Sequence, residues 1–127
     1  MTIEGRSILV VEDDPDTRQL LFETLSSEGF DVTAAGDGWL ALDAAQHKEF
    51  ELAVVDMMLP GIDGEAVASA LSLMEGVPIL LITGNPRPEN IARRMGAYAY
   101  LRKPFELQAL LAAVHTGVSL SSNRRDG

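Results

Sequence analysis

The stretch Leu52-Ala53-Val54-Val55-Asp56-Met57-Met58-Leu59-Pro60-Gly61-Ile62-Asp63-Gly64 begins as an apolar run, ends that run on a carboxylate and passes at once into turn residues. A short, continuous apolar run bounded by turn signals is typical of a strand buried on both faces of a parallel sheet. Asp56 then lies at the carboxyl end of a strand, the edge where open α/β sheets bind ligands. Taken alone, Asp56 is equally compatible with a turn or a helix cap, so the rest of the chain must decide.

The remainder of the chain repeats this alternation of an apolar run and an amphipathic helical segment. Asp14 is a good N-cap and Pro15 suits the first position of a helix. Leu20, Leu21, Phe22 and Leu25 then form an apolar face of that helix. We expect strands at residues 7–11, 30–35, 52–56, 77–83 and 97–102, and helices at 15–28, 39–47, 64–74, 88–95 and 106–118. Five such alternations predict an α/β fold with a doubly wound, five-stranded parallel sheet and helices on both faces.

Length and composition limit the function classes. A chain of 127 residues predicts one domain over residues 1–127, with a core at about 7–118 and a flexible polar tail at 119–127. The sequence has no cysteine, which excludes disulfides and thiol chemistry. No apolar run approaches the roughly 18 residues of a membrane helix and the first residues are polar, so we expect a cytoplasmic protein without membrane contact. A net charge of −9 disfavours direct nucleic-acid binding.

Several polar residues fall at predicted strand ends and would therefore share one edge of the sheet. They are Glu12, Asp13 and Asp14 after the first strand, Asp56 after the third, Thr83 after the fourth and Lys103 after the fifth. Crowded carboxylates raise each other's pKa values unless a cation neutralises them, and Mg²⁺ suits carboxylates combined with waters and a phosphate. We expect Asp13 and Asp56 as direct ligands, Glu12 nearby through water, and the backbone carbonyl of Met58 to complete the shell.

Lys103 and Thr83 supply a cation and a hydroxyl that suit the oxygens of a phosphoryl group. Asp56 is then the nucleophile, because a carboxylate can attack phosphorus and form an acyl phosphate. Each residue alone has a plain structural explanation: a capping acid, a strand threonine, a surface lysine. For Asp14 we prefer the capping role. For the others, their common place at strand ends favours the chemical interpretation.

With these residues in view, the chain resembles the receiver domain of bacterial two-component response regulators from about Ser7 to Val118. The matching segments are Ile8-Leu9-Val10-Val11-Glu12-Asp13-Asp14-Pro15, Asp56-Met57-Met58-Leu59-Pro60-Gly61-Ile62-Asp63-Gly64, Pro78-Ile79-Leu80-Leu81-Ile82-Thr83-Gly84 and Gly96-Ala97-Tyr98-Ala99-Tyr100-Leu101-Arg102-Lys103-Pro104-Phe105. The resemblance implies the (βα)5 flavodoxin-like receiver fold and phosphorylation of Asp56 by a histidine kinase or phosphotransfer protein. It also implies Mg²⁺ held by Asp13 and Asp56, and a phosphoryl group bound by Thr83 and Lys103.

The resemblance also implies a switch. Thr83 would move toward the phosphoryl group and Tyr100 would turn inward, which repacks the face of the fourth helix, fifth strand and fifth helix for a downstream protein partner or a phosphorylation-linked homodimer. The peptide bond before Pro104 is cis in the family. Met58 and Asn85 occupy positions that tune hydrolysis of the acyl phosphate. The segment between Thr83 and Lys103 is about two residues shorter than usual, which predicts a short fourth helix.

The leading hypothesis is a switch that assists its own phosphorylation and dephosphorylation without being an enzyme in the usual sense, either as a stand-alone receiver or as the receiver portion of a longer regulator. The alternative is a receiver-fold interaction module that is never phosphorylated. An aspartyl-phosphate phosphohydrolase needs a second carboxylate two residues past the nucleophile, where this chain has Met58. A flavodoxin-like cofactor binder is disfavoured because the acidic residues after the first strand would repel a phosphate.

Overall fold

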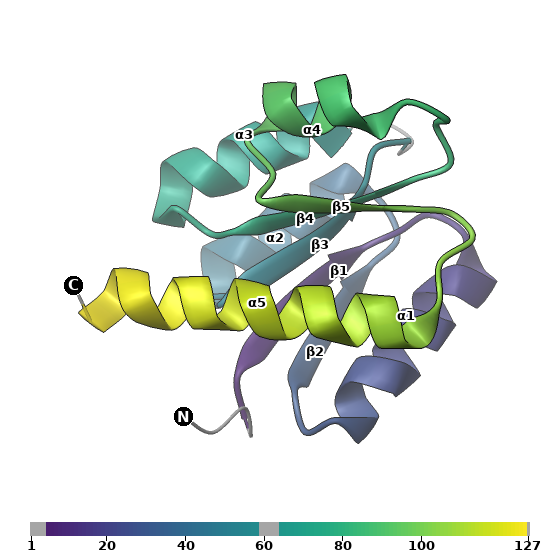
Figure 1. Cartoon of the computed structure of the whole chain (residues 1–127). Coiled ribbons are helices and arrows are strands. Elements are labelled where there is room, and N and C mark those ends of the chain that lie inside the picture. Colours follow the sequence, from purple (N-terminus) through teal and green to yellow (C-terminus); the bar gives the residue numbers. More distant parts are fainter. Residues whose placement is uncertain (1–4, 59–63, 127) are drawn as a thin grey trace.

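The protein is built on one parallel sheet, seen in a computed structural model that describes residues 5–58 and 64–126 (Figure 1). The strand order is β2-β1-β3-β4-β5. The strands are β1 (Ser7–Val11), β2 (Asp31–Ala35), β3 (Leu52–Asp56), β4 (Ile79–Thr83) and β5 (Ala99–Arg102). This order and the all-parallel pairing confirm the predicted doubly wound, flavodoxin-like α/β fold.

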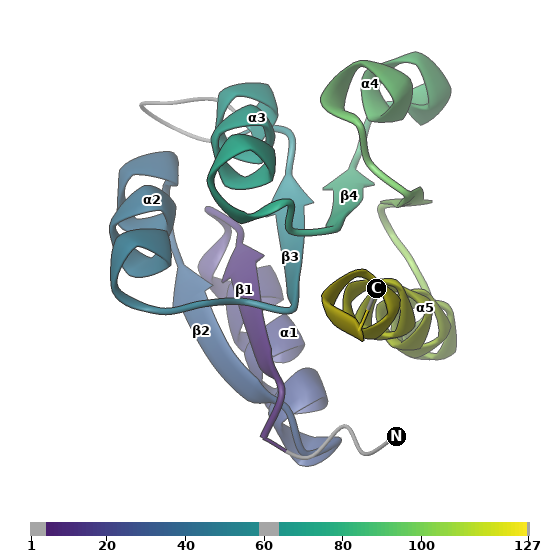
Figure 2. The same cartoon turned by 90° about the vertical axis from the view of Figure 1, so that its left-hand side faces the viewer.

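Across residues 5–58 and 64–126, five helices cover the two faces of the sheet. They are α1 (Pro15–Ser27), α2 (Gly38–His47), α3 (Gly64–Glu75), α4 (Pro88–Met95) and α5 (Leu107–Asp126). Figure 2 shows α1 and α5 on one face and α2, α3 and α4 on the other. None of the helices in the described part of the chain combines the length and apolar character that a membrane span requires.

Each sheet face has its own apolar core because side chains alternate along a strand. In β1, Leu9 and Val11 pack in the core beneath α2, α3 and α4, whereas Ile8 and Val10 pack in the core beneath α1 and α5. Every residue of β3 and β4 is buried, as expected for central strands of a parallel sheet. The central strands therefore carry their last residues, Asp56 and Thr83, on a rigid support.

Local capping chemistry explains where α1 begins and where α4 ends. The side chain of Asp14 accepts a hydrogen bond from the backbone N–H of Thr17 at 2.9 Å, and Pro15 begins α1. Gly96 ends α4 in the left-handed conformation, and the N–H of Ala97 still bonds to the carbonyl of Ala92. The fifth strand therefore begins at Ala99, two residues later than predicted.

Other predictions need correction. The fourth strand begins at Ile79 rather than residue 77, in keeping with the missing N–H of Pro78. Only Leu21 and Leu25 of the α1 face are buried, whereas Leu20 and Phe22 are 46% and 37% exposed. The predicted turn around Pro60, Gly61 and Asp63 lies outside the described residues.

The last helix contradicts the predicted tail. Instead of ending near Val118, α5 continues to Asp126. Ser121, inside the expected tail, is fully buried and donates a hydrogen bond to Glu51 Oε2 at 2.9 Å. Arg6 Nη1 donates to the same oxygen at 3.2 Å. This long-range contact anchors the end of α5 beside the first strand, and nothing in the local sequence indicates it.

Candidate functional site at the carboxyl edge of the sheet

Asp56 is the last residue of β3 and is only 4% exposed. Its Oδ1 accepts a hydrogen bond from the backbone N–H of Met58 at 3.1 Å, and its Oδ2 accepts one from Lys103 Nζ at 3.0 Å. Lys103 follows β5 and reaches across the edge of β4, so the topology of the sheet brings the two residues together although 47 positions separate them. The carboxylate is fixed by one donor on each oxygen.

Glu12 follows β1 and is completely buried. Its Oε2 accepts a hydrogen bond from the backbone N–H of Asp14 at 3.1 Å, and its Oε1 lies 2.6 Å from Lys103 Nζ. Burial and the neighbouring Asp56 carboxylate raise the pKa of Glu12 from 4.5 to about 7. Burial lowers the pKa of Lys103, but its contacts with Glu12 and Asp56 outweigh this effect and raise it above the ordinary value.

Three carboxylates meet at this edge. One carboxylate oxygen from each of Glu12, Asp13 and Asp56 lies within 4.8 Å of the others. Glu12 Oε1 forms an ion pair with Lys103, but this buried oxygen has no hydrogen-bond partner among the described residues. The buried carboxylates of Glu12 and Asp56, one of whose oxygens lacks a hydrogen-bond donor, and the exposed Asp13 form a donor set that suits a hard divalent cation. Asp14, which caps α1, is outside this set.

The loop that carries Glu12 and Asp13 is held by a residue that the sequence analysis missed. Arg18 Nη1, from the second turn of α1, donates to the backbone carbonyl of Glu12 at 3.1 Å and to that of Asp13 at 3.3 Å. On the other side of the loop, the N–H of Glu12 bonds to the carbonyl of Ala35 at 3.0 Å. The sequence offers only a weak signal for this role, an arginine four residues after the N-cap.

Thr83 ends β4 and is buried, and its backbone carbonyl accepts a hydrogen bond from the N–H of Lys103 at 2.7 Å. Its Oγ1 accepts a hydrogen bond from the N–H of Asn85 at 3.1 Å. The side chain of Asn85 is engaged in the same loop, where its Oδ1 accepts from the N–H of Arg87 at 2.8 Å. The hydroxyl of Thr83 is therefore held by its own loop.

The remaining predicted positions lie around this centre. Met58 is 69% exposed, Tyr100 is 39% exposed, and the Tyr100 hydroxyl donates to Glu89 Oε1 of α4 at 3.4 Å. The Lys103–Pro104 peptide bond is cis. The fourth helix, which the shortened segment predicted to be short, has eight residues and begins at Pro88.

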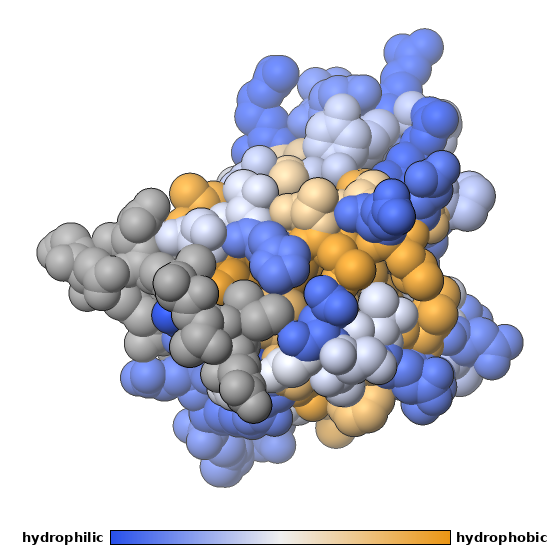
Figure 3. All heavy atoms as spheres, turned by 60° about the horizontal axis from the view of Figure 1, so that its bottom comes forward, coloured by the Kyte–Doolittle hydropathy of each residue, from blue (hydrophilic) through white to orange (hydrophobic). Residues whose placement is uncertain are grey.

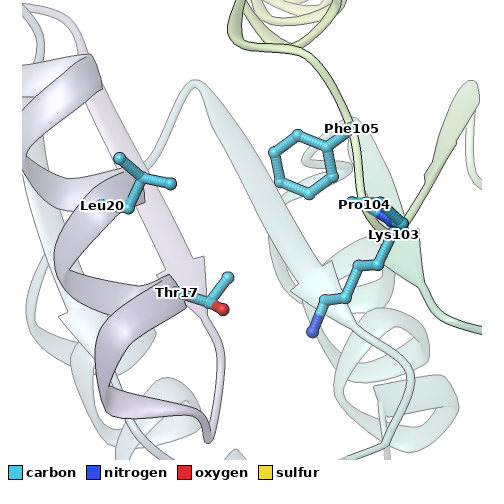
Figure 4. A pocket seen from close by; sticks show the side chains of 5 residues that line it. All are labelled: Thr17, Leu20, Lys103, Pro104 and Phe105. Atoms are coloured by element: carbon cyan, nitrogen blue, oxygen red, sulfur yellow. The ribbon is translucent and has the colours of Figure 1, made fainter.

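A pocket of about 340 Å³ lies beside the site, between α1 and the connection from β5 to α5. Figure 4 shows Thr17 and Leu20 on α1 facing Lys103, Pro104 and Phe105 across this pocket. Figure 3 shows apolar atoms exposed on one side of the molecule and bordered by hydrophilic side chains. Lys103 lines this pocket and also binds Asp56, so the pocket adjoins the acidic site. Leu20, Pro104 and Phe105 give the pocket a largely apolar wall.

Fold and site together define a class. A doubly wound α/β domain carries a buried aspartate at the end of its central strand, an acidic cluster beside it and a lysine bound to it, all at the edge where this architecture places its ligands. This is the arrangement of a doubly wound α/β domain with an acidic, ligand-binding centre at the carboxyl edge of its sheet.

Comparison with known proteins places the chain in a family. Residues 8–115 match the model of the response regulator receiver domain, and the chain belongs to this family, whose members act in two-component signalling. It is 38% identical over 109 residues to the DNA-binding response regulator MtrA of Mycolicibacterium smegmatis, covering 84% of this chain and 48% of that protein. It is 34% identical over 117 residues to the transcriptional regulatory protein PdtaR of Mycobacterium tuberculosis, covering 90% and 57%. The chain thus spans about half the length of these curated relatives.

Solved structures agree with this assignment. The signal receiver domain of an HD domain-containing protein from Pseudomonas fluorescens has a TM-score of 0.90 at 25% identity, covering 99% of this chain and 96% of that chain. The chemotaxis protein CheY4 of Vibrio cholerae has a TM-score of 0.81 at 30% identity, covering 88% and 98%. The resemblance inferred from the sequence motifs is therefore confirmed at the level of family and fold.

Proposed function

We propose that this chain is a phosphorylation switch in which Asp56 accepts a phosphoryl group from a histidine kinase or a phosphotransfer protein. The observation that carries the proposal is the Asp56 carboxylate itself, buried at the end of β3 and held between Met58 N–H and Lys103 Nζ. One carboxylate oxygen would attack phosphorus and form an acyl phosphate, while the bond from phosphorus to the donor breaks. Lys103 is already positioned to neutralise charge on the transferred group.

A divalent cation, Mg²⁺ by the family's general preference, would be held by Asp13 and Asp56, with Glu12 beside them and the backbone carbonyl of Met58 completing the set. When bound, this ion supplies charge neutralisation at the acidic cluster and at the phosphoryl oxygens. The chain's own residues do the positioning: Lys103 bridges Glu12 and Asp56, and the capping of α1 by Asp14 fixes the end of the acidic loop.

The output would be a change at the face formed by α4, β5 and α5. Phosphorylation adds negative charge and acceptor oxygens at Asp56. Thr83 would exchange its loop contact with Asn85 for the phosphoryl group, and Tyr100 would leave its contact with Glu89 and turn inward. A downstream protein, or a second copy of the chain, would read the repacked face. Met58 and Asn85 would set how fast the acyl phosphate hydrolyses, since Asn85 can hydrogen-bond to a water and Met58 cannot.

The direct test is the intact mass of the protein after incubation with acetyl phosphate, with and without Mg²⁺. We expect a phosphoryl mass increase that requires Mg²⁺ and is lost in Asp56→Asn. Asp43→Asn, which changes an exposed carboxylate of α2, is the matched control and should behave as the unaltered protein. Consumption of the donor is followed in the same samples, so that rapid hydrolysis of the adduct is detected as turnover.

A folded protein that neither gains mass nor consumes the donor would contradict the proposal. That result would favour the second candidate, a receiver-fold interaction module that is not phosphorylated. The two candidates also differ in a binding experiment, because only the switch changes its affinity for a partner when the phosphodonor is added.

A further inference from the structure

Arg18 makes an unusual pair of contacts for a helical arginine. Its Nη1 donates to two consecutive backbone carbonyls, those of Glu12 at 3.1 Å and Asp13 at 3.3 Å. The side chain is half-buried, and the backbone N–H of the same residue bonds to the carbonyl of Asp14 at 2.9 Å. One residue thus binds all three carbonyls of the acidic loop.

The contacts of Arg18 complete the fixation of that loop. The N–H of Glu12 is bound to the carbonyl of Ala35, and the N–H of Asp14 is bound to Glu12 Oε2. Arg18 binds the carbonyl groups of the two peptide bonds that join Glu12, Asp13 and Asp14. Within residues 5–58 and 64–126, no hydrogen bond or ion pair holds the Asp13 side chain, so its backbone is what sets where its carboxylate lies.

Gly36, just after β2, leaves room for this arrangement. A Cβ at this position would lie 2.9 Å from Arg18 Nη1, closer than an ordinary contact, and 3.5 Å from Cζ, so the end of the arginine side chain would have to shift. The guanidinium therefore occupies the space that any other residue at position 36 would partly fill. Two positions that are 18 residues apart in the sequence thus cooperate to hold the acidic loop.

We propose that Arg18 is a positioning residue for the cation site, which holds the backbone of Glu12 and Asp13 so that their carboxylates and that of Asp56 converge, and that Gly36 is the position that admits it. This inference rests on the proposed function, because it assigns a role in the cation site that the function requires. Groups that orient metal ligands without touching the metal typically change metal affinity by about 10- to 100-fold when removed.

The sign of the effect separates positioning from simple electrostatics. Arg18 carries a positive charge close to an acidic cluster, so if it acted only through its charge, its removal would strengthen the binding of a divalent cation. If it acts by holding the loop, its removal weakens binding despite the loss of a repulsive charge. A purely structural role would lower the stability of the protein and leave the affinity of the folded form unchanged.

The test is the Mg²⁺ dissociation constant of the unphosphorylated protein, measured by isothermal titration calorimetry. We expect Arg18→Ala to bind Mg²⁺ about tenfold more weakly, Arg18→Lys to recover part of the loss, and Gly36→Ala to weaken binding without any change in charge. Arg93→Ala, which removes an exposed positive charge from α4, is the matched control and should leave the affinity nearly unchanged. Urea unfolding of each variant measures its stability separately, and Gly36→Ala serves if Arg18→Ala does not fold.

The outcomes are distinguishable. Equal or tighter Mg²⁺ binding in folded Arg18→Ala and Gly36→Ala would overturn the positioning role and leave the proposed function intact. Absence of Mg²⁺ binding by the unaltered protein would overturn both. Weaker binding in both variants, with Arg93→Ala unaffected, would support the role of Arg18.

Discussion

At the scale of single residues, Tyr98 is a half-buried side chain whose hydroxyl is held by a contact with the last helix. Its hydroxyl donates to the carbonyl of Ala113 in α5 at 2.6 Å, and it packs against Gly117, where a Cβ would lie 2.4 Å from the hydroxyl oxygen. Burial raises the pKa of Tyr98 above its ordinary value of 10. The folded state therefore keeps this proton at a pH where the unfolded chain has released it.

This difference predicts a pH dependence. Because the pKa of Tyr98 is higher in the folded state, its contribution to stability is complete below pH ~10 and is lost as the pH rises beyond that value. We expect the unfolding free energy, measured by urea denaturation at pH 8 and pH 10.5, to fall less steeply with pH in Tyr98→Phe than in the unaltered protein. At pH 8 the variant should be about 1 kcal/mol less stable, the contribution of one hydrogen bond.

Tyr100→Phe is the control for this comparison, since the Tyr100 hydroxyl lies at the surface. It removes an exposed tyrosine hydroxyl and leaves the contact between Tyr98 and Ala113 in place. Identical slopes for Tyr98→Phe and the unaltered protein would show that Tyr98 is not responsible.

At the scale of elements, the start of α3 is packed directly on the end of β3. The N–H of Gly64 bonds to the carbonyl of Met57 at 3.1 Å, and a Cβ on Gly64 would lie 2.3 Å from the backbone oxygen of Asp56. Since backbone cannot move aside as a flexible side chain can, we expect Gly64→Ala to destabilise the protein by about 1–3 kcal/mol and to slow phosphorylation of Asp56. Urea unfolding and the acetyl phosphate reaction measure the two effects.

Gly84, which directly follows the neighbouring strand β4, offers a matched control, because a Cβ there would meet nothing within 4 Å. Gly84→Ala should be neutral or stabilising by about 0.4–1 kcal/mol, since alanine restricts the unfolded chain. Equal effects of the two substitutions would contradict the close packing of Gly64 on Asp56.

The extended end of α5 leads to a second prediction at this scale. Ser121 is buried and donates to Glu51 Oε2, so Ser121→Ala should lower the unfolding free energy by about 1–2 kcal/mol. Ser119→Ala changes an exposed serine of the same helix and should have little effect. If the two variants unfold at the same urea concentration, the last turns of α5 contribute nothing to the stability of the fold.

Local signals explain which elements could be predicted. Buried strands such as 52–56 and the Pro88–Met95 helix have strong signals within a few residues: a continuous apolar run, or a proline at the start and a glycine at the end. The end of α5 and the exposure of Leu20 and Phe22 depend on what lies opposite in space, which no local pattern contains. The same distinction holds for the site. Glu12, Asp56 and Lys103 could be predicted to meet because each lies at the end of a strand, whereas the contact of Arg18 depends on the geometry of a loop that no local pattern contains.

At the scale of the whole molecule, the net charge of −9 complicates any experiment with cations. Monovalent salt screens the mutual repulsion of surface carboxylates, so NaCl alone should raise the melting temperature modestly. Mg²⁺ does the same in a general way and, if the cluster of Glu12, Asp13 and Asp56 binds it, stabilises the folded state further by mass action. The specific contribution is the part that NaCl at equal ionic strength cannot reproduce.

Asp13→Asn isolates that contribution, because Asp13 is the exposed member of the cluster and can be changed without disturbing the buried Glu12 and Asp56. Without Mg²⁺ we expect the variant to melt a few degrees higher than the unaltered protein, since one of three repelling carboxylates is gone. In 10 mM MgCl₂, about the level at which a millimolar site is filled, the unaltered protein should gain stability beyond its gain in NaCl, and Asp13→Asn should not. An equal response of both proteins to Mg²⁺ at matched ionic strength would mean that the ion acts on the whole acidic surface rather than on this edge of the sheet.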